Sequence, residues 1–83
     1  MSWFVYIVRC ADDTLYTGIA VDVERRIEQH NTGTGAKYTR SRRPVRVVYV
    51  EEAPDRSAAS RREWEIKQLT RTQKERLIAG ASH

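Results

Sequence analysis

Cysteine is nearly absent from the chain, whose 83 residues include a single one, Cys10. A lone cysteine excludes a disulfide within the chain, and without cysteine or histidine beside it Cys10 cannot form a thiolate zinc site. We therefore expect no chemistry from Cys10, an ordinary residue at the end of a strand. The fold must be stabilised by packing.

A long hydrophobic run is missing as well. The longest apolar stretch lies near Trp3 to Val8, and it is far shorter than the about 20 residues that a membrane-spanning helix requires. No signal-type segment with a cleavage site follows it. These absences argue against a membrane protein and predict a soluble protein of the cytoplasm.

The chain is also too short for two domains. A domain of this size buries only about 60% of the surface that its unfolded chain exposes. We expect one domain over residues 1–83, with its core at about 3–79 and a short disordered C-terminal tail at 80–83.

Acidic residues are in the minority, with 11 Asp and Glu against 15 Lys and Arg and a net charge of +4. The segment from Ala36 to Arg46 is the most one-sided, because it contains no acidic residue. A basic loop is often only a solvated loop, but the aromatic and hydroxyl groups inside this one favour a nucleic-acid partner. The predicted nucleic-acid-binding residues are Lys37, Tyr38, Arg40, Arg42 and Arg43, with Thr39 as a further hydrogen-bonding candidate.

Short runs of β-branched and aromatic residues predict the strands. Residues 3–9 (WFVYIVR) and 15–20 (LYTGIA) flank a turn at Asp12 and Asp13 and are expected to pair as an antiparallel hairpin. Residues 45–50 (VRVVYV) have the composition of a third strand.

Capping residues predict three helices. The first spans 22–30, the second runs from 54–55 to about 69, and a capping box at 72–75 begins a short third helix that ends at Gly80. A flexible basic connection, residues 32–44, joins the first helix to the third strand. The order β-β-α-β-α-α predicts an α+β fold, a small three-stranded antiparallel sheet flanked by helices.

The first predicted helix places two candidate functional side chains at the border of its apolar stripe. At about 100° per residue, Val23 and Ile27 form the buried stripe, and Arg26 and His30 are neighbours at its edge. Two ordinary interpretations remain open. Arg26 could form a helical ion pair with Asp22, and His30 could serve only as a cation at the C-terminal end of the helix.

The second predicted helix places Glu63 in a similar position. Glu63 projects about 60° from Ile66, at the border of the apolar stripe. It could instead form an ion pair with Lys67, four residues later. Trp64 falls on the other side of the helix, where we expect the third helix to cover it, and Trp3 is expected to be a packing residue.

These side chains suit the hydrolysis of a phosphodiester, which needs a base for water, relief of negative charge at phosphorus and stabilisation of the leaving oxygen. Glu63 offers a hard oxygen ligand, and one carboxylate is enough for Mg²⁺, which fills the rest of its shell with water and phosphate oxygens. Arg26 has the planar, permanently charged fork that suits a nonbridging phosphate oxygen. Lysine in its place should work less well.

Three side chains are candidates for the base. An unperturbed phenol such as Tyr6 or Tyr16 has a pKa of about 10, so a nearby metal and Arg26 would have to lower it. His30 titrates near neutrality and could take or relay the proton. The choice among the three stays open. Gly18 permits close backbone approach, so that a phosphate or a metal-bound water can reach the tyrosines.

Taken together, these residues resemble the GIY-YIG nuclease domain family, and specifically its small stand-alone members of the UPF0213 type. The two tripeptides of the family fall on residues 4–6 (FVY) and 16–18 (YTG). An arginine eight residues past the glycine falls on Arg26, a histidine or tyrosine on His30 and a helix glutamate on Glu63. The resemblance covers the chain from Trp3 to about Leu69, in the family's order of elements.

Three departures from the family pattern bear on the strands and the substrate. Phe4 stands where the first tripeptide has glycine, and Thr17 where the second has isoleucine. Both concern the strand and leave the proposed reactive groups in place. A C-terminal asparagine found in some relatives has no match here, which affects substrate positioning.

The resemblance implies a function. It implies a DNA endonuclease that depends on Mg²⁺, or Mn²⁺, and leaves a 3′ hydroxyl and a 5′ phosphate, with structure-specific cutting and a role in DNA repair or recombination. Glu63 would hold the metal, Arg26 the phosphate, and Tyr6, Tyr16 and His30 the water.

Two alternatives belong to other classes. One is a nucleic-acid-binding module of the same fold with little or no catalysis, for DNA or RNA. The other is a subunit that needs a protein partner for targeting.

Overall fold

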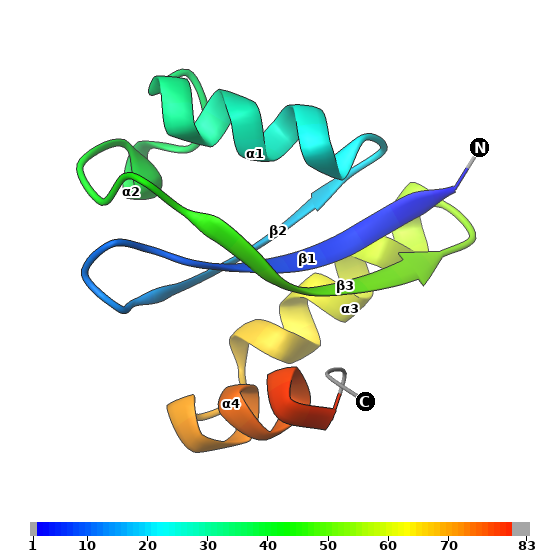
Figure 1. Cartoon of the computed structure of the whole chain (residues 1–83). Coiled ribbons are helices and arrows are strands. Elements are labelled where there is room, and N and C mark those ends of the chain that lie inside the picture. Colours follow the sequence, from blue (N-terminus) through cyan, green and yellow to red (C-terminus); the bar gives the residue numbers. More distant parts are fainter. Residues whose placement is uncertain (1, 81–83) are drawn as a thin grey trace.

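A three-stranded antiparallel sheet forms the centre of the protein, with strand order β2-β1-β3 (Figure 1). The computed structural model describes residues 2–80. The elements are β1 (Trp3–Arg9), β2 (Leu15–Ala20), α1 (Val23–Thr32), α2 (Lys37–Arg40), β3 (Arg46–Ala53), α3 (Arg56–Lys67) and α4 (Arg71–Gly80). The predicted fold class is confirmed, and the short helix α2 is an addition to the predicted order.

Strand β1 is the middle strand and is covered on both faces. Its residues Val5, Tyr6, Ile7 and Val8 are all 0–1% exposed. Because successive side chains of a strand point to opposite faces, Val5 and Ile7 face one side of the sheet and Tyr6 and Val8 the other. The same run that looked only hydrophobic in the sequence therefore contributes to two separate cores.

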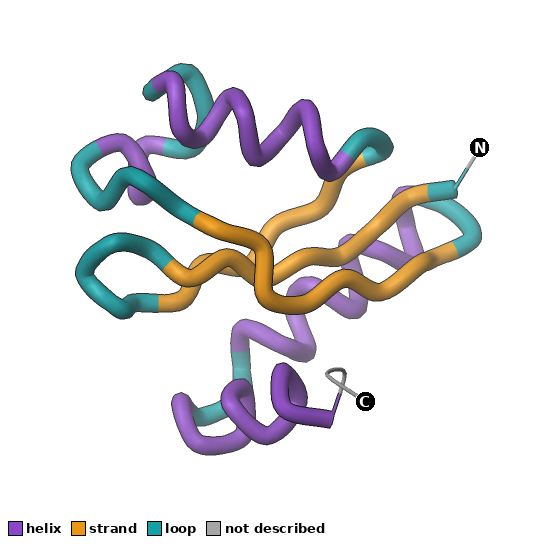
Figure 2. The backbone as a smooth tube through the Cα atoms, in the orientation of Figure 1, coloured by secondary structure: helices purple, strands orange, loops and turns teal. Residues whose placement is uncertain are grey.

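The two cores lie between different helices and the sheet. Helices α3 and α4 cover one face, where Ala59, Ile66 and Ile78 pack with Val5 and Ile7 (Figure 2). Helix α1 covers the other face, where a second cluster gathers around Tyr6. The members of this second cluster are Tyr6, Val8, Cys10, Ala20 and Val45, with Tyr16, Val23 and Ile27 packed against them.

Caps begin two of the helices where the sequence predicts them. The Asp22 carboxylate accepts a hydrogen bond from the Arg25 amide at 3.1 Å, and Asp55 does the same for Ala58 at 2.8 Å. Helix α1 runs two residues beyond the predicted end to Thr32, because Gly33 adopts the left-handed conformation, φ 87°, that closes a helix. Helix α3 ends at Lys67, two residues before its predicted end.

The capping box of α4 lies two residues earlier than predicted. Thr70 donates its amide to Gln73 Oε1 at 2.9 Å, and the Gln73 amide donates to Thr70 Oγ1 at 3.2 Å. The predicted box at Thr72 and Glu75 is wrong, because Glu75 is engaged by arginine side chains instead. Trp64 is 63% exposed, so the prediction that α4 covers it is wrong as well.

Two segments between helices are more ordered than predicted. Strand β3 extends to Ala53, because residues 51–53 pair with residues 3–5 of β1. The connection at 32–44 contains α2 and is anchored by Asn31, whose side chain donates to the Val45 carbonyl at 3.0 Å and accepts from the Val45 amide at 2.7 Å. The prediction of a flexible loop is therefore wrong for this segment.

The structure tests only part of the prediction for the C-terminal tail, because it describes residues 2–80. The predicted tail was 80–83, but Gly80 is the last residue of α4, and residues 81–83 lie outside the described residues. Across residues 2–80, no helix combines the length and the apolar composition that crossing a membrane requires.

An arginine–glutamate pair joins the end of β1 to α4. The Arg9 guanidinium donates to both carboxylate oxygens of Glu75, at 3.1 and 2.7 Å, and Arg71 reaches the same carboxylate. Hydrogen bonds from Arg9 and Arg71 lower the pKa of Glu75 from 4.5 to about 2. A lowered folded-state pKa means that this carboxylate stabilises the fold fully above pH 4.5 and progressively less as the pH falls toward 2.

Glu75→Gln should therefore flatten the acid limb of the stability curve. We expect the free energy of unfolding, measured by urea at several pH values, to fall less for this variant than for the wild type between pH 4.5 and 2. Glu28→Gln, at an exposed residue with no ion pair within the described structure, is the matched control and should follow the wild type. Parallel curves for wild type and Glu75→Gln would refute the assignment.

Candidate active site

Tyr6 is the centre of the candidate site, and Gly18 makes room for it. The two residues are partners across the β1–β2 ladder. A Cβ at position 18 would lie 2.5 Å from the Tyr6 hydroxyl and 2.7 Å from Cζ, closer than real Cβ contacts allow. The phenol therefore lies directly over the Gly18 backbone. The sequence led us to expect that Gly18 admits a phosphate or a metal-bound water, and the group that lies against it in the structure is the Tyr6 phenol.

His30, which lies on α1, forms a hydrogen bond with the Tyr6 hydroxyl. The hydroxyl lies 2.9 Å from His30 Nε2, and the imidazole is 0% exposed. The other ring nitrogen, Nδ1, lies 2.7 Å from Thr39 Oγ1. Gly35 allows this burial, because a Cβ there would lie 2.5 Å from Nδ1. His30 is therefore held on both nitrogens, which is more than a charge at a helix end.

Tyr16 lies beside the same histidine. Its ring meets the His30 ring edge-on, with centroids 5.4 Å apart. Tyr38 stacks on Tyr16 at 5.7 Å, and the Arg42 guanidinium lies 4.0 Å above the centre of the Tyr38 ring. The stack connects the α2 segment to β2. Tyr38, predicted to stack on nucleic-acid bases, is thus already engaged within the protein.

Arg26 projects from α1 beside Tyr6. Its guanidinium donates to Gln29 Oε1 at 3.1 Å, a contact that we did not predict. The alternative ion pair with Asp22 is absent from the described residues, where the Asp22 carboxylate caps the helix instead. Arg26 is half-buried, as its place at the border of the stripe predicted.

Glu63 approaches from the other face of the sheet. Helix α3 packs along β2, an edge strand that also contacts α1. The Glu63 side chain is 23% exposed and lies 3.4 Å from Lys67 Nζ, which is the predicted helical ion pair. Its carboxylate nevertheless acts electrostatically on the Tyr6 phenol, as do Arg26 and Tyr16. Side chains from β1, β2 and α1 thus meet at Tyr6, and the charge of Glu63 on α3 helps to raise the pKa of its phenol.

Burial is the largest cause of the pKa shifts of Tyr6 and His30. It raises the pKa of the Tyr6 phenol above its usual value, and the Arg26 guanidinium offsets part of the rise. Burial also lowers the pKa of His30, and the positive charge of Arg26 lowers it further. At neutral pH His30 is therefore a neutral imidazole with one nitrogen free to accept a hydrogen bond.

The donor set fits a metal that takes few protein ligands. In residues 2–80 there is no cluster of three or more His, Cys, Asp or Glu that could hold a metal ion, which argues against a zinc or calcium cage. Within residues 2–80, Glu63 is the carboxylate whose charge acts on the pKa of Tyr6, and its side chain is partly exposed. A single carboxylate suits Mg²⁺ or Mn²⁺, which complete their shells with water and phosphate oxygens.

The basic segment divides into structural and free cations. Arg42 donates to the Tyr38 carbonyl at 2.7 Å and pairs with Asp12 at 3.1 Å, and Arg43 donates to the carbonyls of Arg40 and Asn31. These arginines stabilise the turn. Lys37 and Arg40 are exposed, and their side chains form no hydrogen bond or ion pair within the described part of the chain.

The sequence analysis missed the true partner of Thr39 and did not consider Gln29 at all. Thr39 was expected to meet nucleic acid, yet it is 0% exposed and bonds to His30. Its side chain lies on an irregular connection, so no periodicity links it to His30 nine residues earlier. For Gln29 the spacing of three residues from Arg26 on one helix was an available signal.

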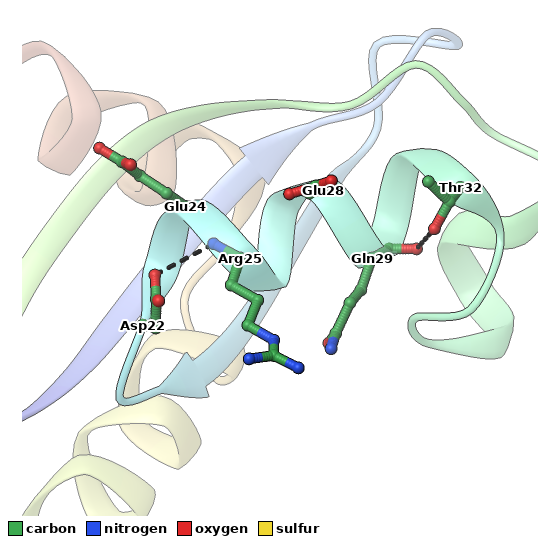
Figure 3. Close-up of a pocket in the computed structure, with 6 residues that line it drawn as sticks. All are labelled: Asp22, Glu24, Arg25, Glu28, Gln29 and Thr32. Atoms are coloured by element: carbon green, nitrogen blue, oxygen red, sulfur yellow. Dashed lines mark hydrogen bonds between the residues drawn. The ribbon is translucent and has the colours of Figure 1, made fainter.

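A surface hollow on α1 meets these groups only through Gln29, the partner of Arg26. It has a volume of about 560 Å³ and lies along the solvent side of α1 (Figure 3). Its lining is polar and open: Asp22, Glu24, Arg25, Glu28, Gln29 and Thr32. The hollow contains neither tyrosine nor histidine, and the convergence at Tyr6 is therefore the better candidate for chemistry.

Comparison with known proteins identifies the class to which this fold and site belong. The GIY-YIG catalytic domain matches residues 2–76. The chain belongs to the GIY-YIG family, a nuclease family whose members are generally divalent-metal-dependent endonucleases acting on DNA.

Its similar relatives are small proteins of one type. A UPF0213 protein of Desulfotalea psychrophila is 60% identical over 78 residues, which cover 93% of this chain and 71% of that protein. A UPF0213 protein of Staphylococcus aureus is 58% identical over 77 residues, covering 93% of this chain and 94% of that one.

Two solution structures resemble this fold. The UPF0213 protein from Bacillus halodurans has 47% sequence identity and a TM-score of 0.61, with 95% of this chain and 84% of that chain covered. A protein from E. faecalis has 40% identity and a TM-score of 0.65, with 96% and 85% covered.

The contact between Gly18 and Tyr6 can be tested directly. Gly18→Ala should lower the free energy of unfolding by about 1–3 kcal/mol, because the added methyl displaces the buried phenol. It should also break the hydrogen bond to His30, which NMR of the imidazole would detect. Gly80→Ala is the control, since a Cβ there meets nothing within 4 Å. Wild-type stability in Gly18→Ala would contradict the close packing.

Proposed function

We propose that this protein is a divalent-metal-dependent DNA endonuclease that hydrolyses phosphodiester bonds. The observation that carries the proposal is the gathering around Tyr6 of a guanidinium and an imidazole from α1 and a second tyrosine from β2, with the Glu63 carboxylate of α3 acting electrostatically on the same phenol. Each of these side chains has an ordinary structural use alone. Their conjunction around one phenol matches the needs of phosphodiester hydrolysis, in a chain of a nuclease family.

Glu63 would hold the metal, Mg²⁺ or Mn²⁺. When bound, such a cation neutralises charge on the scissile phosphate and the leaving oxygen and makes a coordinated water more acidic. Lys67 now lies 3.4 Å from the Glu63 carboxylate and keeps it paired. The Lys67 ammonium is free to leave, because its side chain is 48% exposed.

Arg26 would bind a nonbridging phosphate oxygen. Gln29 holds one arm of the guanidinium at 3.1 Å and thereby orients the remaining donors. A guanidinium fixed before the substrate arrives stabilises the negative charge that builds up in the transition state without reorganisation.

Tyr6 and His30 would handle the proton of the attacking water. The phenol has a raised pKa and is protonated at neutral pH, so it can accept a proton only by giving up its own. His30 Nε2, at 2.9 Å, is the acceptor in reach. Tyr16 forms no hydrogen bond through its hydroxyl within residues 2–80, which leaves this group free to bind the water or a phosphate oxygen.

The DNA backbone would pass over the free cations of the α2 segment. Lys37 and Arg40 are exposed and unpaired within the described structure, and they belong to the segment that contributes Tyr38 and Thr39 to the site. The role in repair or recombination and the preference for branched or flap structures follow only from the family resemblance.

Glu63→Gln should abolish metal-dependent cleavage without unfolding the protein. We expect a loss of roughly 10²-fold or more in the cleavage rate, because the several kcal/mol that a metal supplies would be lost. The assay uses duplex, flap, branched and single-stranded DNA with Mg²⁺, Mn²⁺ or chelator.

Glu65→Gln is the matched control for this variant. Glu65 lies on the same helix, and its side chain pairs with Arg62 at 3.3 Å, away from Tyr6. Undiminished cutting by Glu63→Gln would remove Glu63 from the mechanism. Binding of DNA by the wild type without cleavage under any metal condition would favour the non-catalytic module.

Replacing Lys37 and Arg40 by Gln should weaken DNA binding in a salt-dependent way. If each cation neutralises one phosphate, the slope of log K against log salt should fall by about 1–2 in the double variant. Fluorescence anisotropy with a short labelled duplex in chelator measures this. The control is Arg25→Gln with Arg61→Gln, two exposed arginines that have no side-chain partner in the described structure. Equal slopes for both double variants would show that the segment does not meet phosphate.

A further inference from the structure

A continuous chain of hydrogen bonds runs beneath the candidate site. The Tyr6 hydroxyl lies 2.9 Å from His30 Nε2, His30 Nδ1 lies 2.7 Å from Thr39 Oγ1, and Thr39 Oγ1 lies 3.0 Å from the Ala36 carbonyl oxygen. Tyr6 is 1% exposed, and His30 and Thr39 are 0% exposed. The chain therefore links β1, α1 and α2 without access to solvent along its inner part.

The Ala36 carbonyl determines the direction of this chain. A carbonyl oxygen only accepts, so the single hydrogen of the Thr39 hydroxyl points to Ala36. Thr39 Oγ1 is then an acceptor for His30, whose hydrogen must be on Nδ1. A neutral imidazole carries one hydrogen, and Nε2 is left as an acceptor for the Tyr6 hydroxyl. All three bonds, at 2.9, 2.7 and 3.0 Å, are satisfied in this direction.

One contact favours the reverse direction, and it is the weakest. The Ala36 amide points at His30 Nδ1 from 3.4 Å, which would make Nδ1 an acceptor. The Thr39 hydrogen would then turn to Nδ1, and Thr39 Oγ1 would face the Ala36 oxygen at 3.0 Å with no hydrogen between them. Exchanging a 3.0 Å bond for a 3.4 Å contact is unfavourable.

We propose that Thr39 is a positioning residue that fixes His30 as the Nδ1–H tautomer and so keeps Nε2 free to take the Tyr6 proton. The catalytic consequence rests on the proposed function, whereas the tautomer itself does not. When Tyr6 accepts a proton from the attacking water, its own proton moves to Nε2, and the imidazole becomes a cation that still donates through Nδ1 to Thr39. Thr39 thus remains bonded to His30 in both protonation states.

The α2 segment accordingly has a structural purpose. Arg42 and Arg43 fix it by bonds to backbone carbonyls, and Gly35 lets its backbone lie against the imidazole. The result is that Thr39 is presented to Nδ1 at 2.7 Å. The surroundings of the ring are otherwise Tyr6 from β1, Tyr16 from β2 and Arg26 on its own helix.

The tautomer can be read directly by NMR of the imidazole nitrogens. The chain has two histidines, so His83→Gln leaves His30 as the sole signal. We expect a pyrrole-type Nδ1 and a pyridine-type Nε2 in this background and in Thr39→Ser, which keeps the hydroxyl. In Thr39→Val the Ala36 amide becomes the one partner for Nδ1, and the hydrogen should move to Nε2.

Cleavage assays then test the consequence. Thr39→Val should lose about 10²-fold in rate, the lower range of what general acid–base catalysis contributes, and Thr39→Ser should retain most of the activity. Thr72→Val, at an exposed position of α4, controls for the loss of a hydroxyl elsewhere. Circular dichroism establishes that each variant is folded.

The outcomes separate the two proposals. A His30 hydrogen on Nε2 in the wild-type background, or an unchanged tautomer in Thr39→Val, would overturn the role of Thr39. If Thr39→Val does not fold, the tautomers of the wild-type background and of Thr39→Ser still decide the question. A wild-type protein that cuts no DNA would refute the proposed function, and the NMR result would stand by itself.

Discussion

The buried hydrogen bond between Tyr6 and His30 is the constraint on which the site depends. It joins the middle strand to the last turns of α1, on a face of the sheet where most other contacts are apolar. A polar pair inside a core is costly unless its partners are met, and here no side-chain nitrogen or oxygen buried in the described part of the protein lacks one. The Tyr6–His30 hydrogen bond therefore fixes both the position of α1 on the sheet and the orientation of the Tyr6 hydroxyl.

The two charged candidate residues, Arg26 and Glu63, lie on helices that cover opposite faces of the sheet. Arg26 comes from the helix on one face and Glu63 from the helix on the other, and both helices contact the edge strand β2. A substrate phosphate bound between a guanidinium and a metal on Glu63 would meet Tyr16 on that same strand. The two helices that carry these charged side chains are therefore positioned by their packing on the sheet.

Local signals predicted the elements well, because strand composition and helix caps act over a few residues. The hairpin, the caps at Asp22 and Asp55 and the border positions of Arg26 and Glu63 all follow from such short-range rules. Predictions that depended on distant partners were weaker. The capping box was placed at Thr72 because that pattern fits Glu75, but Arg9, 66 residues away in the chain, engages Glu75.

The same limit explains what was missed within the site. Tyr38 and Thr39 lie in a basic run, and their composition indicated a surface that meets nucleic acid. Their actual partners are Tyr16 and His30, reached only after the turn at Gly35 folds back on α1. No helix or strand periodicity in the sequence predicts that the chain folds back on α1 after Gly35. The proximity of Tyr6, Tyr16 and His30 could be anticipated, whereas the support that Thr39 gives to His30 could not.

The missing side chains at Gly18 and Gly35 have a consequence for the substrate. Backbone packs closely against the Tyr6–His30 pair at Gly18 and Gly35, and both side chains are at most 1% exposed, so the pair is held within the core. If the protein cuts DNA, the distortion has to come from the nucleic acid. A continuous duplex is stiff and resists sharp bending, while a junction or a frayed end yields at little cost. The rigid site would then select DNA that is already easy to distort.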